Sequence, residues 1–251
     1  MNSGENTVPA YLEFAPPREL RPFVDRLWVH RIEGPPPSEG RRLLPDGRMY
    51  FVWTRDQGAR ISGPQTGHMT LPDGPPVLAF GAAFHPGAAP NLLRTRASAL
   101  VDDHVALDAV LPRVGARLDD RLAHARDPRE ALTAIADELS LRVRLVASPN
   151  AAVRDAVRLL NFTATTVSDV AARVFVSERE LQRRFVEHIG YGPKTLQRIL
   201  RFQRFMLQLG SPQIDLAGAA ALAGYADQSH LSRETRRLTD MTPRQLTRWT
   251  H

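Results

Sequence analysis

The segment VSDVAARVFVSERELQRRFVEHIGYGPKTLQR (167–198) decides the fold, because LAGAAALAGYADQSHLSRETRRLTDMTPRQLTR (216–248) repeats its pattern. A shift of 50 positions aligns Ser177 with Asp227, two residue types that cap the N-terminus of a helix. Each copy predicts two short helices joined by a turn, and the second helix is rich in polar side chains. This arrangement is typical of a helix-turn-helix that enters the DNA major groove. The same shift aligns Ala171 with Ala221, Leu181 with Leu231, Arg183 with Arg233, Pro193 with Pro243, Leu196 with Leu246 and Arg198 with Arg248.

The repeat predicts an all-helical C-terminal region. A rigid connecting helix between the copies would hold two recognition helices at successive major-groove faces, about 34 Å apart. Its expected core residues are Leu196, Ile199, Leu200, Met206 and Leu209. The expected elements are a supporting helix over Val167–Val174, a turn at Phe175-Val176, a recognition helix over Ser177–Ile189, the connecting helix over Lys194–Leu209, a helix over Leu216–Ala223 capped by Asp215, a turn at Gly224-Tyr225, and a second recognition helix over Gln228–Thr239 capped by Asp227.

Polar side chains on the outward faces of the recognition helices are the candidate DNA contacts. Leu181 and Phe185, four positions apart, mark the buried face of the first one. Arginine can pair with guanine and glutamine with adenine, whereas arginines farther along the helix are better placed for phosphates. An ordinary solvated helix face is the alternative for any single residue, but the repeated caps and turns favour DNA. The candidates are Arg179, Gln182, Arg183, Gln228, Ser229, Ser232 and Arg233 for bases, with Arg236 and Arg237 for phosphates.

The charge distribution agrees with this interpretation. Residues 1–150 hold 18 arginines and 18 acidic residues, whereas residues 151–251 hold 15 basic and 9 acidic residues. The whole formal excess of +6 therefore lies in the repeat region, as expected if that region faces phosphates. Lys194 is the only lysine. The abundance of arginine suits contacts with phosphate and guanine, although genomic G+C bias is an alternative explanation.

Length and composition exclude several other classes of protein. A chain of 251 residues is long enough for two domains, each with its own core. It has no cysteine, which excludes disulfides, thiolate metal sites and cysteine nucleophiles. No apolar run approaches the ~20 residues that span a bilayer, and the N-terminus lacks the pattern of a signal peptide. We expect a soluble cytoplasmic protein that associates with the nucleoid when it binds DNA.

The first hundred residues indicate a β-rich domain. Short β-prone runs alternate with turn clusters, which suggests a compact barrel or sandwich. An early helix is expected from Arg18 to about Leu27. The β-prone runs are Leu27–Ile32, Arg48–Thr54, Ala59–Ser62 and Pro76–Phe84, and the turn clusters are GPPP (34–37), LPDG (44–47), SGPQTG (62–67) and LPDGPP (71–76).

The pattern becomes helical near Asp103. Pro128 fits the first turn of a helix, and residues 147–150 read as a linker to a helix with Val153, Val157 and Leu160 on one face. Two amphipathic helices at this place can form a dimer contact, or both can pack on the barrel, and the sequence leaves both alternatives open. Their apolar residues are Leu107, Val110, Leu111, Val114 and Leu118, followed by Ala131, Leu132, Ile135, Leu139 and Val143.

The C-terminal region resembles the AraC/XylS family of bacterial transcription regulators. GYADQSHLSR (224–233) is close to the family's signature, and the 50-residue spacing, the connecting helix and Thr242-Pro243 are also similar. The resemblance covers about residues 151–251. It implies tandem helix-turn-helix units, promoter binding and, in activators, contact with RNA polymerase. Three residues depart from the family pattern: Thr235 stands where phenylalanine is usual, Asp240 where glycine is usual, and the turn Val174-Phe175 lacks a glycine.

The N-terminal half resembles more loosely a β-rich domain that is found attached to such DNA-binding regions. The resemblance rests on LRPFVDRLWVHR (20–31), LPDGRMYFVW (44–53), SGPQT (62–66) and HPGAAPNLL (85–93). In the wider family these domains bind effectors or dimerise. The aromatic residues can line a small-molecule pocket or form the barrel core, and the sequence does not separate the two. They are Trp28, Tyr50, Phe51, Trp53, Phe80 and Phe84.

Nothing in the sequence favours an enzyme. His30, His68, His85 and His104 have no metal-ligand spacing, and there is no phosphate-binding loop or nucleophile elbow. We therefore expect no enzymatic activity, no cofactor and no metal. Two other hypotheses compete with a regulator: a small-molecule-binding enzyme with a structural helical tail, and a nonspecific architectural DNA binder.

Together these observations predict an α+β multidomain protein. It has a β-rich, barrel-like domain at 1–102, a helical connector at 103–148, and at 149–251 an all-α domain with two helix-turn-helix units joined by a long helix. The predicted function is sequence-specific transcription regulation, modulated by a small molecule or by dimerisation. The candidate partners are double-stranded promoter DNA, RNA polymerase, a small-molecule effector and a second copy of the chain, with no membrane association.

Overall fold

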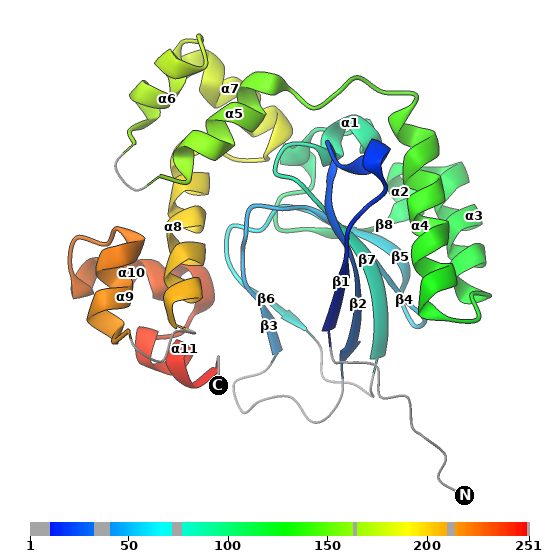
Figure 1. The fold of residues 1–251 in the computed structure, drawn as a ribbon, viewed down its shortest axis with the longest axis horizontal. Helices are drawn as coiled ribbons and strands as arrows, with labels where there is room; N and C mark the ends of the chain where they lie inside the picture. The colour runs from blue at the N-terminus through cyan, green and yellow to red at the C-terminus, as the bar shows by residue number, and fades with distance from the viewer. Residues whose placement is uncertain (1–10, 33–40, 72–76, 163–164, 210–213, 250–251) are drawn as a thin grey trace, which may run out of the picture.

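The computed structural model describes residues 11–32, 41–71, 77–162, 165–209 and 214–249. Its first part is a β-sheet flanked by helices, and its second part is entirely helical (Figure 1). One large hydrophobic core extends from Leu20 to Leu139 and another from Val153 to Leu246. The predicted fold class, a β-rich N-terminal part followed by helices and two helix-turn-helix units, is confirmed.

The N-terminal sheet has six antiparallel strands in the order β1-β2-β7-β4-β5-β8, and β3 pairs with β6 separately. The predicted runs correspond to β2, β4, β5 and β7, whereas β1, β3, β6 and β8 have only three or four residues and were not predicted. Such strands are too short to show a reliable alternation. The cluster GPPP (34–37) and residues 72–76 lie outside the described residues. The strands are β1 (Tyr11–Phe14), β2 (Val24–Ile32), β3 (Arg41–Leu43), β4 (Tyr50–Thr54), β5 (Gly58–Ser62), β6 (Met69–Leu71), β7 (Val77–Phe84) and β8 (His104–Ala106).

The helix expected from Arg18 to Leu27 is wrong. Only the 3-10 turn η1 (Arg18–Leu20) forms there, and β2 begins at Val24. Pro22 has no amide hydrogen to donate, so a helix running through it would lose a backbone hydrogen bond. The following residues pair with β7 over the length of β2, and this long-range pairing outweighs the local apolar spacing.

The aromatic residues of the sheet divide between its two faces. Phe51, Trp53, Phe80 and Phe84 are buried in the large core beneath the helices, as the core interpretation expects. Trp28 instead lies in a small cluster with Ala79 and Ala83, against which Tyr50 packs. A cavity of about 20 Å³ remains in the large core, beside Phe51 and Glu138 among other residues. It has room for about one water molecule, so this cavity is too small for an effector.

The helices of the connector pack on the sheet. α2 (Leu107–Val110) is followed by α3 (Pro112–Ala123) and α4 (Pro128–Val143), with Pro128 in the first turn as predicted. Trp53 Nε1 donates to Asp119 Oδ1 at 2.6 Å, which ties α3 to β4. Figure 1 shows α3 and α4 beside the sheet, and the shorter α1 (Ala89–Leu93) and η2 (Ala97–Ala99) precede them. Most of the predicted apolar residues are buried within the chain, as the packing alternative expects.

The C-terminal helices agree with the prediction to within one residue at most ends. The fully buried residues of α8 include the predicted Leu196 and Ile199, and also Phe202 and Phe205, which were not predicted. We call α6 and α7 the first unit, and α9 and α10 the second unit. The helices are α5 (Ala151–Leu160), α6 (Val167–Arg173), α7 (Glu178–His188), α8 (Pro193–Leu209), α9 (Leu216–Ala223), α10 (Gln228–Thr239) and α11 (Pro243–Trp249).

The register of the repeat changes inside each unit. The recognition helices align at 50 positions, but the supporting helices align at 49, because their caps are Thr166 and Asp215. The buried equivalent of Ala171 is therefore Ala220, and its predicted partner Ala221 is exposed. The positive-φ residue of the first turn, Phe175, lies two positions before the cap Ser177, whereas Gly224 lies three positions before the cap Asp227. A single shift could not reveal this inserted residue.

The end of α10 carries backbone strain. Asp240 caps this helix in the left-handed conformation, with φ of +57°, where the first unit has Gly190 at φ of +100°. A β-carbon is unfavourable in this conformation, and a negative charge is unfavourable at a helix C-terminus. We expect Asp240→Gly to raise the free energy of unfolding by roughly 0.5–1 kcal/mol in urea denaturation.

Asp240→Ala is the matched control for that substitution. It removes the same carboxylate but keeps the β-carbon, so any stabilisation should be smaller than that given by glycine. Equal stabilisation by glycine and alanine would show that charge, rather than backbone conformation, dominates at this position.

Candidate nucleic-acid interface

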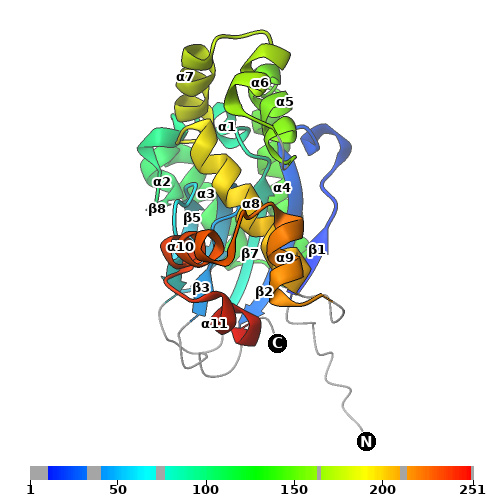
Figure 2. The same ribbon diagram turned by 90° about the vertical axis from the view of Figure 1, so that its left-hand side faces the viewer.

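The two recognition helices lie near opposite ends of α8. In Figure 2, α7 and α10 both lie toward the left of the view, whereas α6 and α9 lie toward the right. Each recognition helix begins at a capping side chain: Ser177 accepts from the backbone N–H of Glu180, and Asp227 accepts from that of His230. One chain therefore presents two similar helices, one from each unit.

All the predicted contact residues lie at the surface. The opposite faces of the two helices are buried through Leu181 and Phe185 in α7 and through Leu231 and Leu238 in α10. Ser232 is partly exposed, and the other predicted residues are exposed: Arg179, Gln182, Arg183, Gln228, Ser229, Arg233, Arg236 and Arg237. The N-terminal half covers none of the exposed candidates, so they are accessible to a duplex.

The first recognition helix neutralises its own charge. Arg183 forms two hydrogen bonds of 2.8 Å with Glu180 and a third of 3.3 Å with Glu187. Arg184 also donates to Glu180, at 2.6 Å. The hydrogen bonds from Arg183 and Arg184 lower the pKa of Glu180 to about 2, so this carboxylate stays ionised at physiological pH. DNA must compete with these acidic groups for Arg183.

The second recognition helix has no such counter-charges on its outer face. Among the described residues, no acidic group pairs with Arg233, Arg236 or Arg237. Burial and then the nearby Arg237 lower the pKa of Arg198 on α8. An uncompensated group of arginines is the electrostatic environment that phosphates stabilise. Arg198 belongs to this group and was not predicted.

A polar cluster that the sequence analysis missed fastens α10 to α8. Arg201 on α8 lies 3.1 Å from His230 Nε2 and 3.6 Å from Glu234, both on α10. Its guanidinium lies 5.6 Å from the ring centroid of Tyr225, whose ring also contacts His230 edge-on. The tyrosine and histidine of GYADQSH could have indicated that a polar cluster forms here. Their partner Arg201 could not be identified, because it is distant in the sequence.

The second unit accommodates Thr235 through a hydrogen bond within α10. This side chain is fully buried, and its hydroxyl donates to the carbonyl of Leu231 at 2.7 Å, so no polar atom is left unsatisfied. Thr239 repeats the pattern by donating to the carbonyl of Thr235 at 2.8 Å. Polar contacts from α8 thus hold α10 where the first unit uses the ring of Phe185.

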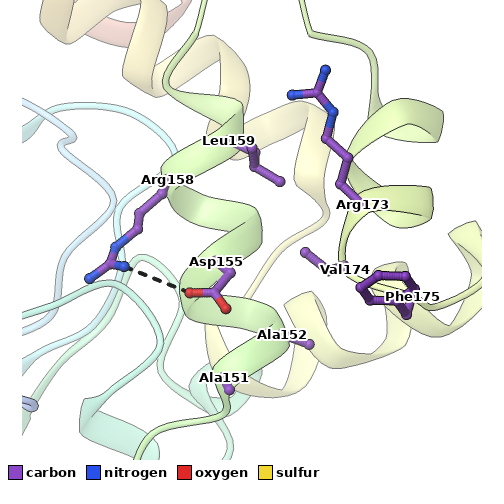
Figure 3. A pocket seen from close by; sticks show the side chains of 8 residues that line it. All are labelled: Ala151, Ala152, Asp155, Arg158, Leu159, Arg173, Val174 and Phe175. Atoms are coloured by element: carbon purple, nitrogen blue, oxygen red, sulfur yellow. Dashed lines mark ion pairs between the residues drawn. The ribbon is translucent and has the colours of Figure 1, made fainter.

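The turn of the first unit carries an exposed aromatic residue in a strained conformation. Phe175 has φ of +57° and is 94% exposed. It borders a surface hollow of about 430 Å³ between α5 and the end of α6 (Figure 3). The wall formed by α5 includes Asp155 and Arg158, whose charged groups are 3.8 Å apart. The hollow thus combines an apolar ring with an ion pair.

The described part of the chain shows neither a metal centre nor a membrane span. No three histidine, aspartate or glutamate residues in it converge as metal ligands would. His30, His68, His85 and His104 lie apart, and burial lowers the pKa of His68 and His104. None of the described helices is both long enough and apolar enough to cross a bilayer.

The internal ion pairs of α7 predict the effect of removing Glu180. We expect Glu180→Gln to raise the affinity for random DNA and to steepen its salt dependence, because Arg184 becomes free for phosphates and Arg183 keeps only its longer bond to Glu187. The slope of log affinity against log salt should increase by about 1–2. Fluorescence anisotropy across a salt series measures both effects.

Glu178→Gln is the matched control for Glu180→Gln. It removes one negative charge from the same helical turn, and within the described residues Glu178 forms no ion pair. Equal gains from the two substitutions would show that net charge alone, not release of the arginines, sets the affinity.

Comparison with known proteins gives two family matches. Residues 170–248 match a family model described as a helix-turn-helix domain. Residues 12–106 match a domain of unknown function, DUF6597. A search of curated proteins gives no match.

Three similar solved structures are all of ToxT from Vibrio cholerae. A single-substitution variant of apo ToxT has a TM-score of 0.49 and 10% identity, covering 90% of this chain and 97% of that chain. Another ToxT structure has a TM-score of 0.45 and 11% identity, covering 87% and 95%. Wild-type ToxT bound to unsaturated fatty acid has a TM-score of 0.47 and 10% identity, covering 87% and 93%.

Proposed function

We propose that this protein is a DNA-binding transcription regulator of the AraC type that binds a specific promoter sequence through both units. The match of residues 170–248 to a helix-turn-helix family model supports the proposal. α7 and α10 enter successive major-groove faces. Arg179, Gln182 and Arg183 read one face, and Gln228, Ser229, Ser232 and Arg233 read the other. Arg236 and Arg237 bind phosphates.

One observation carries this proposal. Two capped helices of similar design stand at the ends of one connecting helix, and their predicted contact residues are exposed or partly exposed. The uncompensated arginines of the second unit favour it as the main source of affinity. The arginines of the first unit are paired with glutamates, so this unit then contributes mainly to discrimination between DNA sequences.

We assign regulation to the N-terminal half, with residues 1–102 as the sensing domain, 103–148 as its helical connector and 149–251 as the DNA-binding domain. A small molecule modulates promoter binding in this proposal. Trp28 supports it, because its indole N–H is buried and has no hydrogen-bond partner among the described residues. A small polar ligand would satisfy such a donor. The effector shifts the equilibrium only if it binds the DNA-competent and incompetent states with different affinity.

The test is binding of the purified protein to the intergenic DNA upstream of its own gene and to scrambled DNA, measured by fluorescence anisotropy across a salt series. We expect a preference of at least ~10³-fold for the native fragment, with a steep salt dependence. Equal binding to both fragments would indicate an architectural DNA binder. No binding to either, together with stoichiometric uptake of a common cofactor, would favour the enzyme hypothesis.

A further inference from the structure

A turn from the N-terminal half is built into the core of the DNA-binding half. This turn is LPDG (44–47), between β3 and β4. The carbonyl of Pro45 accepts a hydrogen bond of 2.6 Å from Gln203 Nε2 in the middle of α8. Leu44 packs against the C-terminal core, and a β-carbon on Gly47 would lie 2.6 Å from Leu196 Cδ1. The turn therefore contacts the connecting helix closely, and one more carbon atom would require the Leu196 side chain to shift.

The turn is stiff by its own chemistry. Pro45 has a fixed φ, and Gly47 occupies the left-handed region at φ of +80°. Asp46 accepts from the backbone N–H of Arg48 at 3.0 Å and from its guanidinium at 3.1 Å, and the hydroxyl of Tyr50 donates to the same carboxylate. Such side-chain-to-backbone bonding locks a turn. A stiff element that contacts α8 transmits the position of the sheet to that helix.

The N-terminal half also holds the end of the first recognition helix. Gly190 follows α7, and a β-carbon on it would lie 2.7 Å from Val101, 2.8 Å from Pro64 and 3.3 Å from the carbonyl of Ala97. These three neighbours all belong to the N-terminal half. The glycine is required here by both its positive φ and this close approach.

The end of the second recognition helix is held in a similar way. The guanidinium of Arg42 on β3 donates to the carbonyl of Thr239 at 2.5 Å, at the last residue of α10. The backbone of Gly67 lies close to the carbonyls of Arg237 and Leu238. The N-terminal half thus contacts both recognition helices at their C-terminal ends. Its described residues do not cover the N-terminal residues of these helices, which contact bases in a helix-turn-helix.

The junction between α7 and α8 is the place where the N-terminal contacts bear on the first unit. Gly190 and Gly192 flank Tyr191 there, and glycine gives a junction little resistance to bending. Tyr191 itself is buried. Burial is the main cause that raises the pKa of its phenol, and the charges of Asp46 and Asp102 in the N-terminal half raise it further. The first unit is held on α8 by the core that they share, and the N-terminal contacts add a second restraint on its tilt at this junction.

We propose that the 44–47 turn, Arg42 and Pro64 form a clamp that sets the separation and tilt of the two recognition helices. In this role they are positioning residues for DNA recognition, and the N-terminal half is a structural part of the reading surface rather than a module tethered to it. The link to DNA rests on the proposed function. The effect of the clamp on the separation and tilt of the helices does not depend on DNA.

The first test measures the clamp without DNA. Because the chain has no cysteine, Val186→Cys on α7 and Leu222→Cys on α9 give two unique sites, both exposed, for spin labels. Pulsed electron spin resonance then gives the distance distribution between the two units. We expect one narrow distribution in the otherwise unchanged chain and a broader or shifted one after Gly47→Ala, whose new methyl group meets Leu196.

Gly58→Ala is the matched control for Gly47→Ala. Gly58 also has a positive φ, of +67°, but its added carbon would meet Asp119 within the N-terminal half. The distribution should therefore stay narrow. If Gly47→Ala leaves the distribution unchanged, α8 alone sets the geometry and the clamp is refuted. Should Gly47→Ala fail to fold, Gln203→Leu, which removes only the bond to Pro45, takes its place with the same expected broadening.

The second test connects the clamp to DNA. On an operator mapped by footprinting with the wild-type protein, one base pair is inserted between the two protected half-sites. Wild-type binding should fall steeply, whereas Gly47→Ala should bind the native operator about tenfold more weakly and respond less to the insertion. Equal sensitivity of both proteins to the insertion would overturn the clamp. Failure of the wild type to prefer any upstream fragment would instead contradict the proposed function and leave the spin-label result to decide the clamp.

Discussion

Arg233→Ala is expected to weaken binding to the operator by about 1–3 kcal/mol, or roughly 10- to 100-fold, and to relax the preference at the base pair it contacts. Arg233 is exposed near the start of α10 and pairs with no acidic group among the described residues. Its guanidinium can therefore turn to a guanine without leaving a protein partner. Arg183→Ala should cause a smaller loss, because Arg183 must first leave Glu180 and Glu187.

Anisotropy titrations on the operator and on single-base variants of it measure this effect. Arg236→Ala is the matched control, because it removes the same charge from the same helix at a position better placed for phosphate. It should weaken binding to all sequences alike and reduce the salt slope by about 1. A uniform loss across sequences for Arg233→Ala would make Arg233 a phosphate contact and contradict its assignment to base reading.

The sequence predicts the C-terminal half well because its signals are local. Capping side chains and helical spacing place α9 and α10 at their observed ends. The register error at Ala221 arose because one inserted residue in a turn is invisible to a constant shift. Phe202 and Phe205 were missed because α8 is buried on a wider face than a single apolar stripe indicates.

The N-terminal half is harder to predict because its structure depends on distant pairing. The apolar spacing from Arg18 to Leu27 is compatible with a helix, and only the ladder with β7 makes Val24–Ile32 a strand. The sequence identified LPDG (44–47) as a turn. It did not show that this turn contacts α8, because that contact joins residues such as Pro45 and Gln203 that are far apart in the chain.

The candidate site divides in the same way. The exposed positions of the contact residues followed from helical periodicity alone. The electrostatic difference between the units did not, because it depends on which charges pair. Glu180 and Arg183 are three positions apart on one helix, whereas Arg201 reaches Glu234 across two helices. The sequence can therefore predict the pair within α7, but not the pair between α8 and α10.

Phe185→Ala is expected to lower the free energy of unfolding by about 3–5 kcal/mol. The ring is fully buried, in a hydrophobic core that includes residues of α5, α7, α8 and α10. Because both units share this core, urea denaturation should show one transition for both units at a lower midpoint, rather than separate loss of the first unit. Phe162→Ala is the matched control, since Phe162 is 65% exposed and its removal should change the stability by less than about 0.5 kcal/mol.

The asymmetry between the units makes a sharper version of this test. Phe185→Thr gives the first unit the residue that the second unit has at the equivalent position, and it should be nearly as damaging as alanine, because no polar cluster like that of Arg201, His230 and Glu234 holds α7 among the described residues. Arg201→Ala should conversely loosen α10 while leaving α7 in place, which hydrogen exchange of the two helices would resolve. If Phe185→Thr is tolerated, the aromatic ring is dispensable in both units, and the polar cluster is not what permits Thr235.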